Sequence, residues 1–174
     1  MPLCGLCETE VADGWRACGA CGHPLDRPVT RHSSPDAVRK ALESARKALA
    51  ATPASVDLTF ARHLAERAEQ TDAAGDTGRA LDLARGARHA VDLAKRRARV
   101  DAALAYADNV LNEARRAGIE TLAFERNVAQ ARTLVTRGDY TAAERLLRRL
   151  SIRTLDQRRE RQLQAVLDRA ATRA

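Results

Sequence analysis

Aromatic residues are scarce in this chain, which has one tryptophan, two tyrosines and two phenylalanines among 174 residues. Alanine supplies much of the apolar share, and an alanine side chain buries little area. A thick globular core is therefore disfavoured, and slim helices that approach one another closely fit better. Glycine and proline are also few, at nine and five, which favours long helices over sheets.

Long apolar stretches are also missing. No run approaches the ~20 apolar residues that a membrane-spanning helix needs. The start of the chain, Met1 to Cys4, has neither a charged leader nor an apolar segment, so no signal peptide is expected. We therefore expect the chain in the cytoplasm, where paired cysteines are more often metal ligands than disulfides.

Acidic residues are outnumbered, 23 to 30, which leaves a net charge of +7. The excess lies towards the C-terminus, because residues 1–75 have a net charge of −1, residues 76–117 of +3 and residues 118–174 of +5. This charge permits a polyanionic partner such as nucleic acid or an anionic membrane. A GC-rich genome would also produce many alanines and arginines without selection for binding, so both interpretations stay open.

The sequence predicts a mostly α fold with a small zinc-ribbon (β-hairpin) head and an elongated helical-hairpin bundle of about five helices. Residues 1–25 hold all four cysteines and would form the head. Residues 26–33 are polar and would form a linker, and residues 34–174 would form the helical domain. We expect the head and the helices to have separate cores.

Several dipeptides predict where helices begin and end. Ser34-Pro35 and Thr52-Pro53 each place a capping residue before a proline at the first helical position. Gly75-Asp76 and Gly138-Asp139 predict helix ends followed by new caps. A long helix is expected between them over about 77–117, although its two glycines at 78 and 86 each cost ~1 kcal/mol relative to alanine.

An internal repeat predicts two related hairpins, at about 53–117 and 120–173. Residues 58–65 match residues 122–129, and each copy then reaches a Gly-Asp turn. If this is a true duplication, Phe60 and Phe124 should be buried at equivalent places. Gly138-Asp139-Tyr140 before an alanine-rich helix resembles the turn of tetratricopeptide-like repeats, and the resemblance covers only that turn. Antiparallel hairpins can also look alike because they obey the same packing rules.

The cysteines form two Cys-x2-Cys pairs, which is the ligand pattern of a tetrahedral thiolate site. Zinc suits such a site because thiolates are soft ligands and tetrahedral geometry costs zinc nothing. The predicted metal ligands are Cys4, Cys7, Cys18 and Cys21.

This segment resembles the short zinc-ribbon modules found at the ends of many bacterial and archaeal proteins, which implies a structural zinc ion. Val11 fits the β position of those modules, Asp13-Gly14 the turn and Leu25 the trailing leucine, and Trp15 or Ala17 would pack the site. Glu8 departs from the pattern because the first knuckle usually has glycine there. We therefore expect the first knuckle to be less regular than the second.

Three other kinds of protein site use cysteines in a similar arrangement. A thioredoxin-like redox pair would need a βαβ context, which the sequence lacks. A rubredoxin-type iron centre has a similar ligand set but usually a longer and more aromatic wrapping. A catalytic zinc would need an open ligand position, which four cysteines close. His23 and His32 are possible additional ligands that we expect in solvent instead.

The last predicted helix has an apolar stripe interrupted by polar residues at 157–162. A continuous buried stripe would turn Arg159 inward, where an unpaired charge is costly. We expect the helix either to project beyond the bundle or to pair this arginine with an acid. A projecting end would expose an apolar face that needs a partner protein or a second copy of the chain. The candidate partner-binding residues are Arg158, Arg159, Arg161, Leu163, Val166 and Leu167.

No phosphate-binding glycine loop, nucleophile motif or distinct carboxylate pair occurs in the sequence, so no enzymatic activity is predicted. The leading hypothesis is a zinc-binding adaptor or scaffold that mediates protein–protein interaction or assembly. The alternative is a nucleic-acid-binding protein that uses the zinc ribbon and the arginine-rich C-terminal helices.

Overall fold

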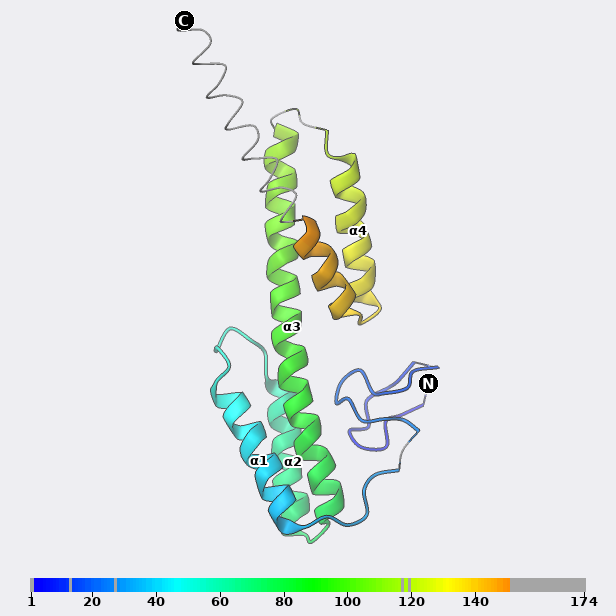
Figure 1. Ribbon diagram of the computed structural model, residues 1–174, viewed down its shortest axis with the longest axis vertical. Helices are drawn as coiled ribbons and strands as arrows, with labels where there is room; N and C mark the ends of the chain where they lie inside the picture. Colours follow the sequence, from blue (N-terminus) through cyan, green and yellow to red (C-terminus); the bar gives the residue numbers. More distant parts are fainter. Residues whose placement is uncertain (1, 13, 27, 117, 119, 151–174) are drawn as a thin grey trace, which may run out of the picture. The chain divides into compact units, whose positions relative to one another are not determined.

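The computed structural model (Figure 1) describes residues 2–12, 14–26, 28–116, 118 and 120–150. This part of the chain is mostly helical, as predicted. It contains four named helices and a further helical stretch over residues 140–150. The named helices are α1 (Pro35–Ala50), α2 (Thr59–Ala73), α3 (Thr77–Arg116) and α4 (Leu122–Thr136). Strand pairing in the described residues is limited to two isolated antiparallel bridges, Leu3–Glu10 and Ala17–Pro24, and no sheet forms there.

The chain forms two compact units, Met1–Lys95 (unit 1) and Arg96–Ala174 (unit 2). The boundary falls within α3, so this helix contributes its first part to unit 1 and its second part to unit 2. In unit 1, α1 and α2 pack against one another, and the first part of α3 runs alongside them (Figure 1).

Unit 1 has one core that includes the cysteine head. The four cysteines are buried together with Leu6 and Val11 of the head, Val38 of α1, Leu64 of α2 and Leu83 of α3. The expectation of separate cores is therefore wrong. The physical reason is that alanines dominate the helix faces, so the helices alone offer little apolar area and the head supplies additional buried side chains.

The core of unit 2 is formed only by helices in the described residues. α3, α4 and the helical stretch 140–150 contribute Val100, Ala107, Leu111, Val128, Ala131, Ala143, Leu147 and Leu150. Phe124 and Tyr140 pack against this core and are partly buried.

The helix start predicted at Ser34 is confirmed, and the one at Thr52 is wrong. The Ser34 hydroxyl accepts the amide of Ala37 at 3.2 Å, and Pro35 is the first residue of α1. The Thr52 hydroxyl instead donates to the carbonyl of Ala48 at 2.6 Å, so it completes the end of α1 and does not cap a new helix. α2 begins only at Thr59.

The two Gly-Asp turns have the same hydrogen-bond pattern. Gly75 and Gly138 both have a left-handed backbone, with φ of 85° and 76°. In each turn the glycine and aspartate amides donate to carbonyls of the helix that ends there, which is how a helix stops at a glycine. The carboxylates of Asp76 and Asp139 then each accept an amide of the next helix at 3.0 Å. One dipeptide thus ends one helix and begins the next.

The two phenylalanines of the predicted repeat lie in different environments. Phe60 is 37% exposed, whereas Phe124 is half-buried against the core of unit 2. The prediction that both are buried is wrong for Phe60, because the buried face of α2 is occupied by Leu64 and by alanines one position further round the helix. The turns repeat, but the phenylalanines no longer support a duplication.

Candidate metal centre

The sulfur atoms of the four predicted ligands lie together in the structure. Cys4 Sγ is 3.7 Å from Cys21 Sγ, and Cys7 Sγ is 3.6 Å from Cys18 Sγ. All four sulfurs lie within 4.8 Å of one another, all four residues are buried, and all are free cysteines. Sulfurs held at ~2.3 Å from a tetrahedral zinc would be ~3.8 Å apart. The cluster therefore has the spacing to bind one metal ion.

Each cysteine pair lies in a backbone knuckle of the same construction. The amide of Cys4 donates to the carbonyl of Thr9 at 2.9 Å, and the amide of Cys18 donates to the carbonyl of His23 at 2.8 Å. The residue after each second cysteine donates back to the carbonyl of the first cysteine, at 2.9 Å from Glu8 and 2.8 Å from Gly22. One antiparallel bridge closes each knuckle. The two knuckles are thus equivalent in their main-chain hydrogen bonds.

Glu8 adopts the glycine-like conformation that the knuckle requires. Its φ of 63° is close to the 72° of Gly22, although a non-glycine residue loses roughly 1 kcal/mol or more in this region. The expectation of a less regular first knuckle is therefore wrong. The Glu8 carboxylate lies 3.1 Å from the guanidinium of Arg67 on α2 and 3.6 Å from that of Arg79 on α3. These ion pairs connect the first knuckle to two helices.

Leu6, rather than Trp15 or Ala17, packs the inside of the head. Leu6 is 1% exposed, whereas Trp15 is 42% exposed and Ala17 is exposed as well. Val11 is buried as expected at the β position. In the predicted turn, Gly14 has a φ of 82°, and Asp13 lies outside the described residues.

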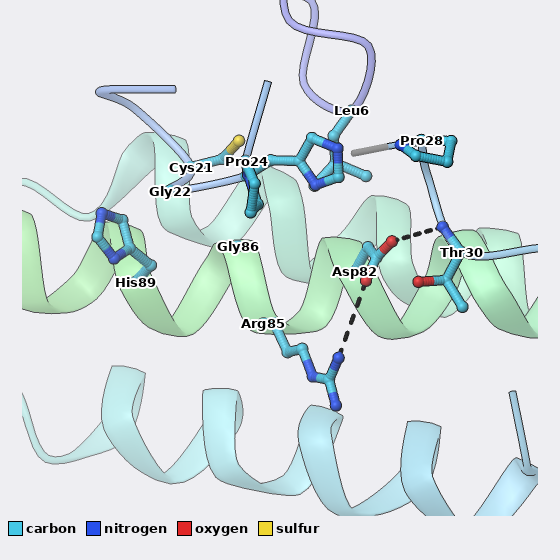
Figure 2. Close-up of a pocket in the computed structure, with 11 residues that line it drawn as sticks. Leu6, Cys21, Gly22, Pro24, Pro28, Thr30, Asp82, Arg85, Gly86 and His89 are labelled. Carbon is cyan, nitrogen blue, oxygen red and sulfur yellow. Dashed lines mark hydrogen bonds and ion pairs between the residues drawn. The ribbon is translucent and has the colours of Figure 1, made fainter. Parts of the chain in front are cut away.

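The second knuckle rests on α3 where this helix has a glycine. A methyl group at Gly86 would lie 3.3 Å from Cys21 Cβ, and one at Gly22 would lie 2.7 Å from the ring of His89. Figure 2 shows Cys21 and Gly22 over the face of α3 that carries Gly86 and His89. Gly86 therefore gives the metal site its close approach to the helix, at the cost in helix propensity that the sequence predicts.

The segment predicted as a polar linker is held on the first turns of α3. The Thr30 amide donates to the Asp82 carboxylate at 2.8 Å (Figure 2). The amide of Ser33 donates to the Thr77 hydroxyl at 3.2 Å, and that hydroxyl donates to the Ser33 carbonyl at 2.9 Å. A side chain at Gly78 would overlap the Thr30 carbonyl. Glycines 78 and 86 lie on the same face of α3 and are the sequence signal that could have indicated this contact.

A cavity of about 360 Å³ lies between the second knuckle, residues 28–30 and α3 (Figure 2). His23 and His89 line it, together with Asp82 and Arg85. Asp82 is already engaged by the Thr30 amide and by Arg85 at 4.0 Å. Neither His23 nor His32 belongs to the group of candidate metal ligands, which consists of the four cysteines.

The electrostatics of the cluster favour a bound cation. Burial raises the pKa of the Cys18 and Cys21 thiols above the usual value. Burial also acts to raise the pKa of Cys7, but hydrogen bonds from the side chain and backbone of Thr9 outweigh it, so that the pKa of Cys7 is lowered. Several thiolates in one buried cluster repel one another and lose hydration, and a metal cation compensates both effects.

The six candidate partner-binding residues, Arg158, Arg159, Arg161, Leu163, Val166 and Leu167, lie outside the residues that the structure describes, and their role stays a prediction. Among the helices that are described, none combines the length and apolar character needed to cross a lipid bilayer.

Comparison of the chain with protein-family models, with curated proteins and with solved structures finds no match.

Proposed function

We propose that this chain is a non-catalytic zinc-binding adaptor, in which a structural zinc ion holds the cysteine head on a helical scaffold. The observation that carries the proposal is the group of four buried sulfurs within the shared core of unit 1. Four thiolates fill the tetrahedral coordination of zinc and leave no position for water or substrate. Such a site stabilises a surface and performs no chemistry on a bound molecule.

We propose zinc rather than iron because of the residues that surround the cysteines in the head. Both metals accept four thiolates, but a rubredoxin-type site usually has a more aromatic surrounding. The head contains one aromatic residue, Trp15, and its side chain is 42% exposed. Free thiols that bind zinc suit a reducing compartment, so we place the protein in the cytoplasm.

Exposed apolar side chains on the head support a role in protein–protein interaction. Leu3 is 61% exposed and Trp15 is 42% exposed, and both line a hollow of about 390 Å³ together with Val11, Leu25 and Val29. Apolar side chains that are exposed together around a hollow indicate a contact surface, and tryptophan is enriched among the residues that contribute most to protein–protein binding.

The zinc part of the proposal is tested by elemental analysis of protein purified with sufficient metal. We expect one zinc per chain, and loss of the zinc in Cys18→Ser. Less than half an equivalent of zinc, or iron in its place, contradicts this part.

The adaptor part is tested by affinity capture from the native cell with the zinc-loaded full chain. We expect Leu3→Asp with Trp15→Asp to lose the proteins that the wild type captures while it retains zinc. The matched control is Phe60→Asp, which changes an exposed apolar residue of α2 in the same unit. Equal capture by all three proteins contradicts a contact surface on the head.

A further inference from the structure

Three arginines of unit 2 converge on one carboxylate. Glu144, in the helical stretch 140–150, lies 3.2 Å from Arg99, 3.1 Å from Arg148 and 3.9 Å from Arg96. The Glu144 side chain is 18% exposed, whereas the arginine side chains are 40% exposed for Arg96, 55% for Arg99 and 74% for Arg148. Three guanidinium groups therefore surround the acid on partly exposed arginine side chains, and Arg96 also donates to the Thr141 hydroxyl at 2.8 Å. One negative charge offsets only one of the three positive charges.

Two further arginines lie on the adjoining side of this helical stretch. Arg145 and Arg149 are exposed and lie one helical turn apart. Each directly follows Glu144 or Arg148 and therefore lies ~100° round the helix axis from it. The resulting arginine surface consists of Arg96, Arg99, Arg145, Arg148 and Arg149. Glu144 is the acid that pairs with three of these residues. Burial acts to raise its pKa, but the hydrogen bonds and charges of Arg99 and Arg148 outweigh burial, so the pKa of Glu144 is lowered. The acid is therefore ionised at neutral pH, and the surface keeps a large net positive charge.

The composition of unit 2 matches this local charge. Unit 1 contains thirteen basic and thirteen acidic residues, whereas unit 2 contains seventeen basic and ten acidic residues, so the whole net charge of +7 belongs to unit 2. All seventeen basic residues of unit 2 are arginine, and the three lysines of the chain lie in unit 1. The planar guanidinium binds phosphate through two parallel hydrogen bonds, which the lysine ammonium does not.

An exposed aromatic side chain lies on the same face of α3. Tyr106 is 45% exposed and follows Arg99 by two helical turns, ~10 Å along the helix axis. Exposed aromatic rings beside arginines stack the unpaired bases of single strands. A duplex would present only phosphates to this ring, and a lipid surface would present no base.

We propose that the arginine surface of unit 2 binds the phosphate backbone of single-stranded nucleic acid and that Tyr106 stacks on a base of the bound strand. This binding is independent of the adaptor role of the head, because it uses residues of unit 2 alone. Recognition through phosphates and one stacked base is largely independent of sequence.

The test measures the anisotropy of a labelled oligouridine of about 20 nucleotides, and of an oligothymidine of the same length, with the zinc-loaded full chain. Arg145→Gln with Arg148→Gln and Arg149→Gln should weaken binding at least about tenfold at low salt. The slope of log Kd against log salt should become shallower by about two, since each lost contact with a single strand contributes ~0.7.

The charge-matched control removes three arginines of unit 2 that are each paired with a single acid outside the surface: Arg97→Gln, Arg115→Gln and Arg132→Gln. We expect this control to weaken binding less than about threefold. If it weakens binding as much as the first triple variant, binding follows net charge and the proposed surface is wrong.

Glu144→Gln separates a binding surface from an ordinary ion-pair network. Removal of the acid frees guanidinium donors for phosphate, so binding should tighten about threefold or more, whereas Asp108→Asn, which removes the acid partner of Arg132, should leave it unchanged. Weaker binding by Glu144→Gln, with the helix signal in circular dichroism unchanged, overturns the proposal.

Tyr106→Leu should weaken binding of both single strands about fivefold or more and leave binding of a duplex unchanged. A wild-type preference for duplex DNA, or for phosphatidylserine vesicles over either single strand, overturns the proposal in favour of another polyanion. The proposal is also overturned if the protein binds none of these probes in a salt-dependent way.

Discussion

Unit 1 holds all four cysteines in its core and has no net charge, whereas unit 2 has only helices in its described part and carries the entire charge of +7. α3 belongs to both units, and its residues differ accordingly. In unit 1 it has one glycine against the head, Gly86, and one against the segment 26–33, Gly78. In unit 2 it has arginines that pair with Glu144. One helix can therefore contribute to two different kinds of surface when side-chain size determines one and charge determines the other.

Loss of the proposed zinc ion should have the largest effect and should affect unit 1 without affecting unit 2. Binding of a structural zinc ion contributes on the order of 10 kcal/mol to folding in small domains, and the cysteines share a core with α1, α2 and α3. In Cys21→Ser we expect amide hydrogen exchange to increase over residues 35–95 and to stay unchanged over residues 100–150. Unchanged exchange in the first range would mean that the head and the helices are energetically separate.

Replacing glycine with alanine should change the free energy of unfolding in opposite directions in the two parts of α3. Gly78→Ala should destabilise unit 1 by about 1–3 kcal/mol, because overlap with the Thr30 carbonyl outweighs the gain of ~1 kcal/mol in helix propensity. At Ala105, which is exposed in unit 2, alanine should be better than glycine by ~1 kcal/mol. Urea denaturation of Gly78→Ala and Ala105→Gly measures both effects. A stabilised Gly78→Ala would contradict the packing of residues 28–33 on α3.

The two phenylalanines should differ in their contribution to stability. Phe124→Ala should cost about 2 kcal/mol, since a half-buried ring loses part of the 3–5 kcal/mol of a fully buried one. Phe60→Ala should cost less than about 1 kcal/mol because its ring is 37% exposed. Thermal unfolding of both variants provides the measurement. Equal costs would restore the equivalence that a duplication requires.

Substitution of Glu8 should have the smallest effect. It should distinguish the effect of backbone strain on stability from the effect of the lost ion pairs. Glu8→Ala keeps a side chain at a φ of 63° and loses the contacts with Arg67 and Arg79, so we expect a loss of about 0.5–1 kcal/mol. Glu8→Gly also loses these contacts but relieves about 1 kcal/mol of strain, so its stability should equal or exceed that of the wild type. Zinc-loaded variants compared by urea denaturation at low and high salt provide the test. An equal loss in both variants would contradict the strained backbone.

Local backbone and ligand chemistry explain what was predictable from the sequence. The spacing of the cysteines predicts a thiolate cluster, because two short knuckles bring four sulfurs together whatever follows them. Ser34-Pro35 and the two Gly-Asp dipeptides predict helix boundaries, since the groups that form these caps lie within a few residues of one another. The mostly helical class follows equally from composition and from the periodicity of apolar residues.

Tertiary contacts decided what local patterns left open. Thr52 has the chemistry of a helix start, but its hydroxyl serves the end of α1. Phe60 has the character of a core residue, but the buried face of α2 lies one position away from it. The glycines of α3 lower the stability of the helix locally. They are needed because Cys21 and Thr30 approach the helix closely at these two positions. The sequence by itself thus determined the cysteine cluster, three of the four predicted helix boundaries and the helical class, because each depends on neighbouring residues. The single core of unit 1, the conformation of Glu8 and the arginines around Glu144 depend on which distant segments meet, so only the tertiary structure decided them.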